Sequence, residues 1–214
     1  GGVCRDVVEK HVLPRLNRND VKFLHGVNEE TRKLIERSSR AEDLKKRFWI
    51  DEMTSVSTLE FAWKHYPWDD YLKDETDFCW QVAKTNKLEL LKWAREEKEC
   101  EWDEWTINAA AYQGNLEMVK YCVANECPID ENACAFAAQN GHLEVLKYLH
   151  EEAKAPWNSV TASRAAENGH LHILEYLIES MFDKYDEVAC HFAAMCGHLD
   201  CLKYLHETAK APWN

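Results

Sequence analysis

Apolar and polar residues follow a pattern that repeats along most of the chain. Five segments align, at steps of 28, 27, 28 and 28 residues, when they are anchored at Asn86, Gly114, Gly141, Gly169 and Gly197. Self-similarity at a fixed period of this length is typical of helical-repeat architectures. The segment LKYLHEEAKAPWN (146–158) also recurs almost unchanged at 202–214, so duplication is the simplest origin of the pattern.

Each repeat predicts two helices joined by a tight turn. In the repeat around Gly141, Asp130 is placed to cap a first helix over residues 131–139, because its side chain can accept backbone N–H bonds. Gly141 ends that helix, since glycine readily adopts the left-handed conformation common at helix C-termini. Residues 142–152 form the second helix, whose apolar residues lie on one face: Leu143, Val145, Leu146 and Leu149.

A bulky apolar residue followed by Asp or Asn stands before each predicted first helix. The pairs are Trp68-Asp69, Trp102-Asp103, Ile129-Asp130, Trp157-Asn158, Tyr185-Asp186 and Trp213-Asn214. We interpret the first residue as a staple under the loop and the second as a helix cap. A tryptophan here can instead be a platform on which a ligand stacks, but six recurrences in one register favour the structural interpretation. The last pair stands where the pattern would start another helix.

The segments AAQNGHLEVLKYL (137–149) and AAENGHLHILEYL (165–177) resemble the helix-turn-helix part of ankyrin repeats. The resemblance covers residues 55–214 and implies an all-α, ankyrin-like helical-repeat solenoid. Two features depart from the family: the period is shorter than the usual length of about 33 residues, and the Thr-Pro-Leu-His opening is largely missing, with only His191 matching its histidine. Residues 55–65 predict a lone second helix that caps the N-terminal end of the stack.

The first fifty residues differ from the rest in charge. Residues 1–50 hold 12 basic and 8 acidic residues, whereas residues 51–214 hold 14 and 30. We therefore predict a helical N-terminal module over residues 1–50 and a repeat domain over residues 51–214, made of half a repeat and about five units. The module is expected to contain three short helices, with a break near Gly26 and with Asp20 and Asn28 capping the second and third.

The pattern of residues 6–35 resembles the F-box, the three-helix motif that joins substrate receptors of ubiquitin ligases to their adaptor. The matching positions are Val7, Val8, Val12, Leu16, Asp20, Val21, Leu24, Val27, Arg32, Leu34 and Ile35. The usual leading Leu-Pro and the expected tryptophan are missing. The resemblance implies a substrate receptor of a cullin-type ubiquitin ligase that binds its adaptor through residues 6–35. The alternative is a helical cap that shields the apolar face of the first repeat.

Three positions of the first helices differ between otherwise similar repeats, which indicates that they are free of packing duty and available for recognition. The first row lies nine residues before the repeat glycine and consists of Trp105, Asn132, Val160 and Val188. The second row lies six residues before it and consists of Asn108, Ala135, Ser163 and His191. The third row lies two residues before it and consists of Tyr112, Gln139, Glu167 and Met195. The ankyrin resemblance implies that first helices line a concave, partner-binding face; free drift is the alternative.

The net charge of −12 at pH 7 bears on the kind of partner. A chain this acidic repels nucleic acid phosphates and anionic lipid surfaces. We therefore predict a protein partner with a basic surface or a basic peptide, and neither nucleic acid nor membrane. The sequence shows no run of 18 apolar residues and no leader pattern, so a cytoplasmic or nuclear location is expected.

Nine cysteines raise the question of metal binding. None of the spacings is the two-residue gap with which two thiolates grip zinc, so we predict no metal. Several cysteines replace apolar core residues of other repeats, which predicts buried free thiols: Cys122, Cys134, Cys190 and Cys201.

No catalytic constellation stands out. Beyond residues 1–2, every glycine except Gly26 is a repeat anchor, so no glycine-rich loop remains for phosphate. A histidine register that Asn115 also fills is better explained as helix-start structure: His142, His170 and His198. We predict no enzyme and no cofactor. The alternative is an enzyme or small-ligand-binding module that uses the Trp-rich concavity, and it requires tryptophans that line an open pocket instead of packing against neighbours.

Overall fold

Of the 214-residue chain, a computed structural model describes residues 12–45, 49–65, 74–180, 182 and 185–212. These residues form helices joined by turns, and no strand occurs among them, so the predicted all-α helical-repeat fold is confirmed. The chain divides into two compact units, residues 1–100 and residues 101–214, which are described separately.

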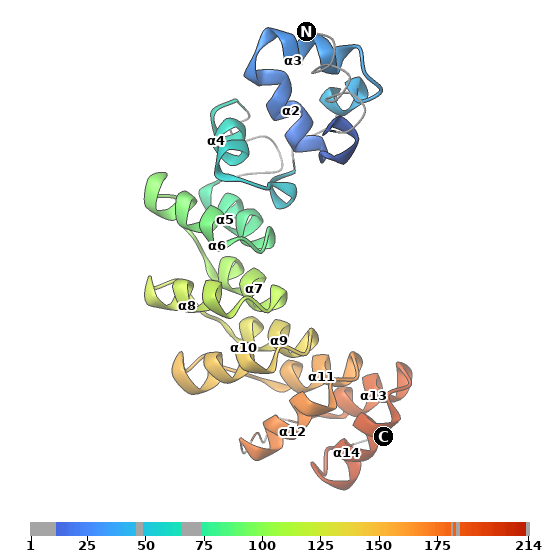
Figure 1. The fold of residues 1–214 in the computed structure, drawn as a ribbon. Helices are drawn as coiled ribbons and strands as arrows, with labels where there is room; N and C mark the ends of the chain where they lie inside the picture. The colour runs from blue at the N-terminus through green and yellow to red at the C-terminus, as the bar shows by residue number, and fades with distance from the viewer. Residues whose placement is uncertain (1–11, 46–48, 66–73, 181, 183–184, 213–214) are drawn as a thin grey trace. The chain divides into compact units, whose positions relative to one another are not determined.

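The C-terminal unit is a series of helix pairs (Figure 1). Its first helices are α7 (Glu104–Gln113), α9 (Glu131–Gln139), α11 (Ser159–Glu167) and α13 (Glu187–Met195). Its second helices are α8 (Leu116–Ala124), α10 (Leu143–Lys147) continued by η6 (Tyr148–Glu152), α12 (Leu171–Glu179) and α14 (Leu199–Glu207). Each first helix packs directly against the next. Both helices predicted for the repeat around Gly141 are confirmed, although the last turn of the second, η6, is a π-helix.

The predicted caps of these first helices are confirmed. In each of them one backbone N–H of the first turn donates to the side chain of the N-cap residue, which is Asp103, Asp130, Asn158 or Asp186. These bonds satisfy donors that have no partner within the helix. The predicted pairs at 68–69 and 213–214 lie outside the described residues.

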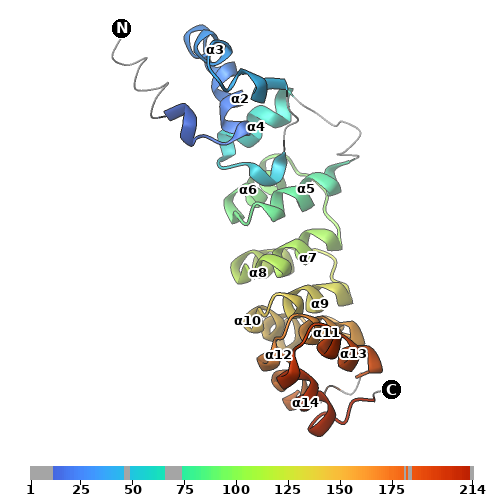
Figure 2. The ribbon, with the colours of Figure 1, turned by 90° about the vertical axis from the view of Figure 1, so that its right-hand side faces the viewer.

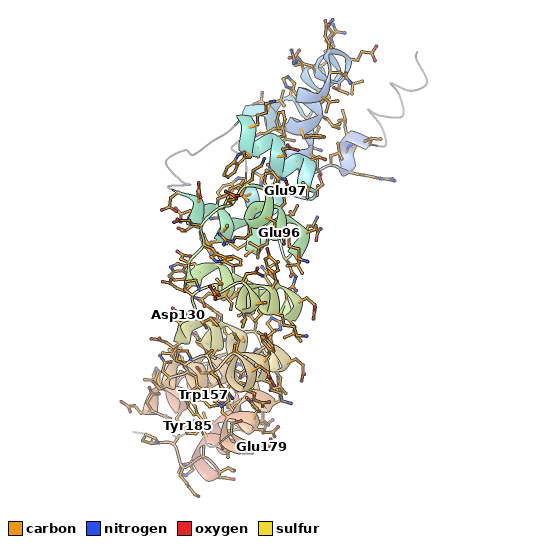
Figure 3. The ribbon with its side chains drawn as sticks, turned by 90° about the vertical axis from the view of Figure 1, so that its left-hand side faces the viewer. Glu96, Glu97, Asp130, Trp157, Glu179 and Tyr185 are labelled. Carbon is orange, nitrogen blue, oxygen red and sulfur yellow. The ribbon has the colours of Figure 1, made fainter. Side chains whose placement is uncertain are left out.

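The aromatic residues of the turns pack against neighbouring rings, as the staple interpretation predicts. Trp102 meets the ring of Tyr121 edge-on, with the ring centroids 6.0 Å apart. Trp157 stacks on His150, with centroids 3.6 Å apart. Figure 3 shows Trp157 and Tyr185 along the same side of the unit. The described turn tryptophans therefore belong to the packing between helices.

Successive repeats contact one another at the glycines. Gly141 has a φ of 71°, a left-handed value that glycine adopts without strain. A Cβ atom there would lie 2.8 Å from Nδ1 of His170 in the next repeat. The same imidazole donates its Nε2–H to the carbonyl oxygen of Gln139, 3.0 Å away. The equivalent contacts join His142 to Gly114 and Tyr112, and His198 to Gly169 and Glu167. The three register histidines therefore tie the repeats around Gly141, Gly169 and Gly197 to the repeat before each of them.

The N-terminal unit is also helical (Figure 2). Its elements are η2 (Leu13–Arg15), α2 (Arg18–Val27), α3 (Glu29–Glu36), η3 (Ala41–Lys45), η4 (Ile50–Glu52), α4 (Val56–His65), α5 (Glu75–Lys84), α6 (Leu88–Lys92) and η5 (Trp93–Glu97). The helix predicted over residues 55–65 is confirmed as α4. Asn86, which replaces the repeat glycine, keeps the left-handed turn with a φ of 60°.

One of the two predicted caps in this unit is wrong. Helix α2 is capped by Asn17, whose side chain accepts the N–H of Asp20 at 2.8 Å, so Asp20 lies within the first turn. The helix starts earlier than predicted because Asn17 already offers a capping oxygen. The second cap is confirmed, since Asn28 accepts the N–H of Thr31 at 2.9 Å.

The break predicted near Gly26 is confirmed, because one helix ends at Val27 and the next begins at Glu29, although Gly26 itself does not end the helix. Helix α2 continues through this residue to Val27. A Cβ atom at Gly26 would lie 2.5 Å from the ring of Phe61 in α4. The glycine therefore permits close packing of α2 on α4, and it does not end a helix.

Polar contacts join the residues on both sides of the boundary predicted at residue 50. Arg18 forms an ion pair with Glu52 at 2.7 Å, and Asn17 donates to the backbone carbonyl of Glu52 at 3.0 Å. The Thr54 hydroxyl donates to Asp20 at 2.9 Å. The division into domains at residue 50 stays a prediction.

Replacing repeat glycines by alanine should separate backbone strain from contact between repeats. Gly141→Ala should lower the free energy of unfolding by about 1–2 kcal/mol, because alanine is strained in the left-handed conformation. The collision of its Cβ with His170 should lower it by about 1–3 kcal/mol more. Gly197→Ala should show only the first loss, because a Cβ there meets no atom within 4 Å and φ is 78°. Urea unfolding of both variants measures the difference. Equal losses, or no relief of Gly141→Ala by an added His170→Ala, would contradict the proposed contact.

Candidate protein-interaction face

Large apolar side chains are exposed at few places in the part of the chain that the structure describes. They are Val12, Val27, Trp105, Tyr112, Val160, Val188, Met195 and Leu199. Five of these eight belong to the first or third row. Apolar side chains that gather on one exposed surface are typical of an interaction site.

The first and third rows share one side of the first helices. Positions seven residues apart lie almost above one another on an α-helix, so Trp105 and Tyr112 face the same way on α7. Trp105 is 47% exposed and Tyr112 is 44% exposed, and Met195 on α13 reaches 62%. The polar members, Asn132, Gln139 and Glu167, are half-buried. We call this side of α7, α9, α11 and α13 the first-helix face.

The second row does not belong to the exposed surface, contrary to the expectation that it is free of packing duty. Asn108, Ala135 and Ser163 are buried, and only His191, on the last first helix, is exposed. The row points toward the next first helix, which covers it. Asn108 donates to the carboxylate of Asp130 at 3.1 Å, and the Ser163 hydroxyl bonds in the same way to the next cap, at Asp186.

A fourth row belongs to the face and was missed in the sequence. It lies five residues before the repeat glycine, where Phe136, Arg164 and Phe192 are half-buried and Ala109 is buried. Phe136 lies edge-on to Tyr112, with centroids 6.0 Å apart, and Arg164 pairs with Glu167 at 2.8 Å. Helical spacing in the sequence could have identified this row, because a position four residues after the first row lies on the same side of a helix.

Acidic residues border the face at the N-terminal ends of the helices. The C-terminal unit holds 18 acidic and 7 basic residues, a net charge of −11. The first residue is Glu104 in α7, Glu131 in α9 and Glu187 in α13, but Ser159 in α11. Glutamate in the first turn stabilises a helix. These glutamates also give this edge of the face a negative potential, except at α11, where Ser159 carries no charge.

The register histidines are engaged in bonds to backbone carbonyls of the preceding repeat. Burial lowers the pKa of His170, although its bond to the Gln139 carbonyl opposes this shift. Trp102 and Trp157 pack against other rings. No group of three His, Cys, Asp or Glu side chains gathers as metal ligands in the described ranges.

The cysteines in the repeat register are buried, as predicted. Cys122, Cys134, Cys190 and Cys201 are all at most 3% exposed. Burial raises the pKa of Cys134 to about 12, and it also raises the pKa of Cys190 and Cys201. Their thiols therefore stay protonated near neutral pH and serve as small apolar core groups.

Comparison with known proteins finds matches over part of the C-terminal unit. A family model of ankyrin repeats in three copies matches residues 135–212, and a second model of ankyrin repeats in many copies matches residues 107–150. No curated protein matches the chain. No helix in the described residues combines the length and the apolar character needed to cross a bilayer.

Thiol labelling at pH 8 should reveal the burial of the register cysteines. Cys196 is exposed and should react rapidly with a disulfide reagent, whereas Cys134 should react only on unfolding, because it is buried and its pKa is about 12. Mass spectrometry of the labelled peptides identifies the site, with Cys196→Ser as the control. A chelator should leave the melting temperature unchanged. Fast labelling of Cys134, or a chelator-sensitive melting temperature with zinc found by elemental analysis, would overturn this assignment.

Proposed function

From the premise that residues 107–212 belong to the ankyrin-repeat family, we propose that this chain is a protein-interaction scaffold that binds its partner on the first-helix face. The observation that carries the proposal is the concentration of exposed large apolar side chains in the first and third rows. Aromatic side chains that become buried at the centre of an interface dominate its binding energy. Trp105 and Tyr112 are the expected anchors.

The partner is expected to present a basic surface. The C-terminal unit carries a net charge of −11, and its glutamates border the same face. Such charges accelerate encounter with a basic partner, and salt screens them beyond about 8–10 Å. Association should therefore slow as ionic strength rises. A cytoplasmic or nuclear setting, where buried thiols remain reduced, agrees with this proposal.

Alanine at Trp105, Tyr112 and Glu167 together should weaken binding by more than about 2 kcal/mol. The partner is first captured with the full chain and identified by mass spectrometry, and the purified pair is then measured by calorimetry. Circular dichroism should show an unchanged fold, because these side chains are exposed or half-buried.

The matched control is Lys147→Ala with Glu175→Ala, on the second helices α10 and α12. This variant should bind as tightly as the unmodified chain. If the control loses binding while the triple variant keeps it, the partner uses the opposite side of the unit.

As a second function we propose that residues 6–35 bind the adaptor of a cullin-type ubiquitin ligase. The N-terminal helices have a small core of their own around Leu13, Val21 and Ile35, and they leave Val12 and Val27 exposed. A separate core with an apolar surface is compatible with a docking module. The competing role is a cap, and it is supported by the contacts of Asn17 and Arg18 with Glu52.

Co-purification with the adaptor distinguishes these roles. If residues 6–35 bind it, the full chain should form a complex at micromolar concentration, and Val27→Asp should abolish the complex without changing the melting temperature. Deleting residues 1–50 should abolish binding in the first case and mainly lower stability and solubility in the second. Failure of the intact chain to bind at micromolar concentration would rule out the ligase role.

A further inference from the structure

We infer that the partner segment on the first-helix face is an extended polyproline II peptide with a Lys or Arg facing each of α7, α9 and α13 and an uncharged residue facing α11. This inference rests on the proposed function of that face. It adds the conformation of the partner and the spacing of its charges.

The spacing of the first helices favours this conformation. Packed helices lie about 8–10 Å apart, and the side chains at the contact set the distance. The first helices are lined with buried alanines: Ala110, Ala111, Ala137, Ala138, Ala165, Ala166 and Ala193. At about 8–10 Å per step, the three steps from α7 to α13 span roughly 24–30 Å.

A partner must repeat its contacts at the same step. A polyproline II helix has three residues per turn and rises about 3.1 Å per residue, so nine residues span about 28 Å with every third side chain on one side. An α-helix matches one contact per repeat only at every seventh residue, and three such steps span about 32 Å. A β-strand turns every third side chain to the opposite side. The polyproline II segment stays in register across all four helices.

The charges along the edge of the face are not uniform, which makes the expected pattern specific. Glu131 and Glu187 are exposed and Glu104 is half-exposed, whereas α11 begins with Ser159. If p is the peptide residue that faces α7, basic residues should occur at p, at p+3 facing α9 and at p+9 facing α13. The order is reversed for the opposite chain direction. At p+6 the peptide faces Ser159 and the exposed Val160, which offer no carboxylate.

The first row provides apolar contacts beside these charges. Trp105 is exposed next to Glu104, and Val188 is exposed next to Glu187. The aliphatic stem of a Lys or Arg can cover such a side chain while its charged end reaches the neighbouring carboxylate. Exposed aromatic rings are also typical of surfaces that bind polyproline II peptides. Such a peptide is already in its bound conformation, so it loses little entropy on binding.

The test selects random 16-residue peptides, displayed on phage, against the full chain at low and physiological salt. The selected peptides should share basic residues at three positions separated by three and six residues, with proline enriched between them. A parallel selection uses Ser159→Glu, which places at α11 the residue that the other three first helices carry. This variant should add a basic residue at the fourth position.

Affinity measurements then assign the charges. For one selected peptide, Glu131→Gln should weaken binding two- to fivefold, because one exposed ion pair is lost. The matched control, Glu144→Gln, lies on α10 and should leave the affinity unchanged. Circular dichroism of the peptide should show a polyproline II spectrum. Basic residues at heptad spacing, no common spacing, or a selection unaffected by Ser159→Glu would each overturn the inference.

These outcomes can be told apart from failure of the proposed function. If the captured protein partner loses binding in the Trp105, Tyr112 and Glu167 triple variant but the selection shows heptad or no spacing, the face binds a partner of another conformation. If that triple variant binds the captured partner unchanged, the proposed function itself is wrong.

Discussion

The contact that Gly114, Gly141 and Gly169 each make with the histidine of the next repeat constrains the rest of the C-terminal unit. Gly141 ends its helix in the left-handed conformation, and the missing side chain leaves room for the ring of His170. That ring also bonds to the Gln139 carbonyl, one of the carbonyls that a helix end leaves without a partner. One pair of residues thus ends a helix, satisfies its terminus and positions the next repeat.

Close stacking decides which side chains of the first helices remain available. Because α7, α9, α11 and α13 pack directly against one another, the side of each helix that points along the stack is covered by the next helix. Asn108 and Ser163 lie there and bond to the following caps. The first and third rows stay at the surface together with Phe136, Arg164 and Phe192 of the fourth, and their variation between repeats gives the face its particular chemistry. A scaffold of identical backbones can therefore present different residues at each step.

The same physical devices serve different purposes in the two units. Glycine in the C-terminal unit provides a left-handed turn together with space for a ring, whereas Gly26 in α2 has an ordinary helical conformation and provides only space, for Phe61. Asparagine caps α2 and α3 through its side chain, while Asn86 adopts the left-handed turn itself. The identity of a residue alone does not tell which of these roles it plays.

The repeat pattern by itself determined the fold class, the bounds of α9, the caps of the first helices and the burial of the register cysteines. These features depend on local hydrogen bonding and on helical periodicity, which neighbouring residues fix. Only the tertiary structure decided the roles of Gly26 and of the second row. Both depend on a helix distant in sequence, α4 in one case and the next first helix in the other. Phe136 and Arg164 could be predicted only in part. Helical spacing places them on the first-helix face, but only the packing of the helices shows that this face is not covered.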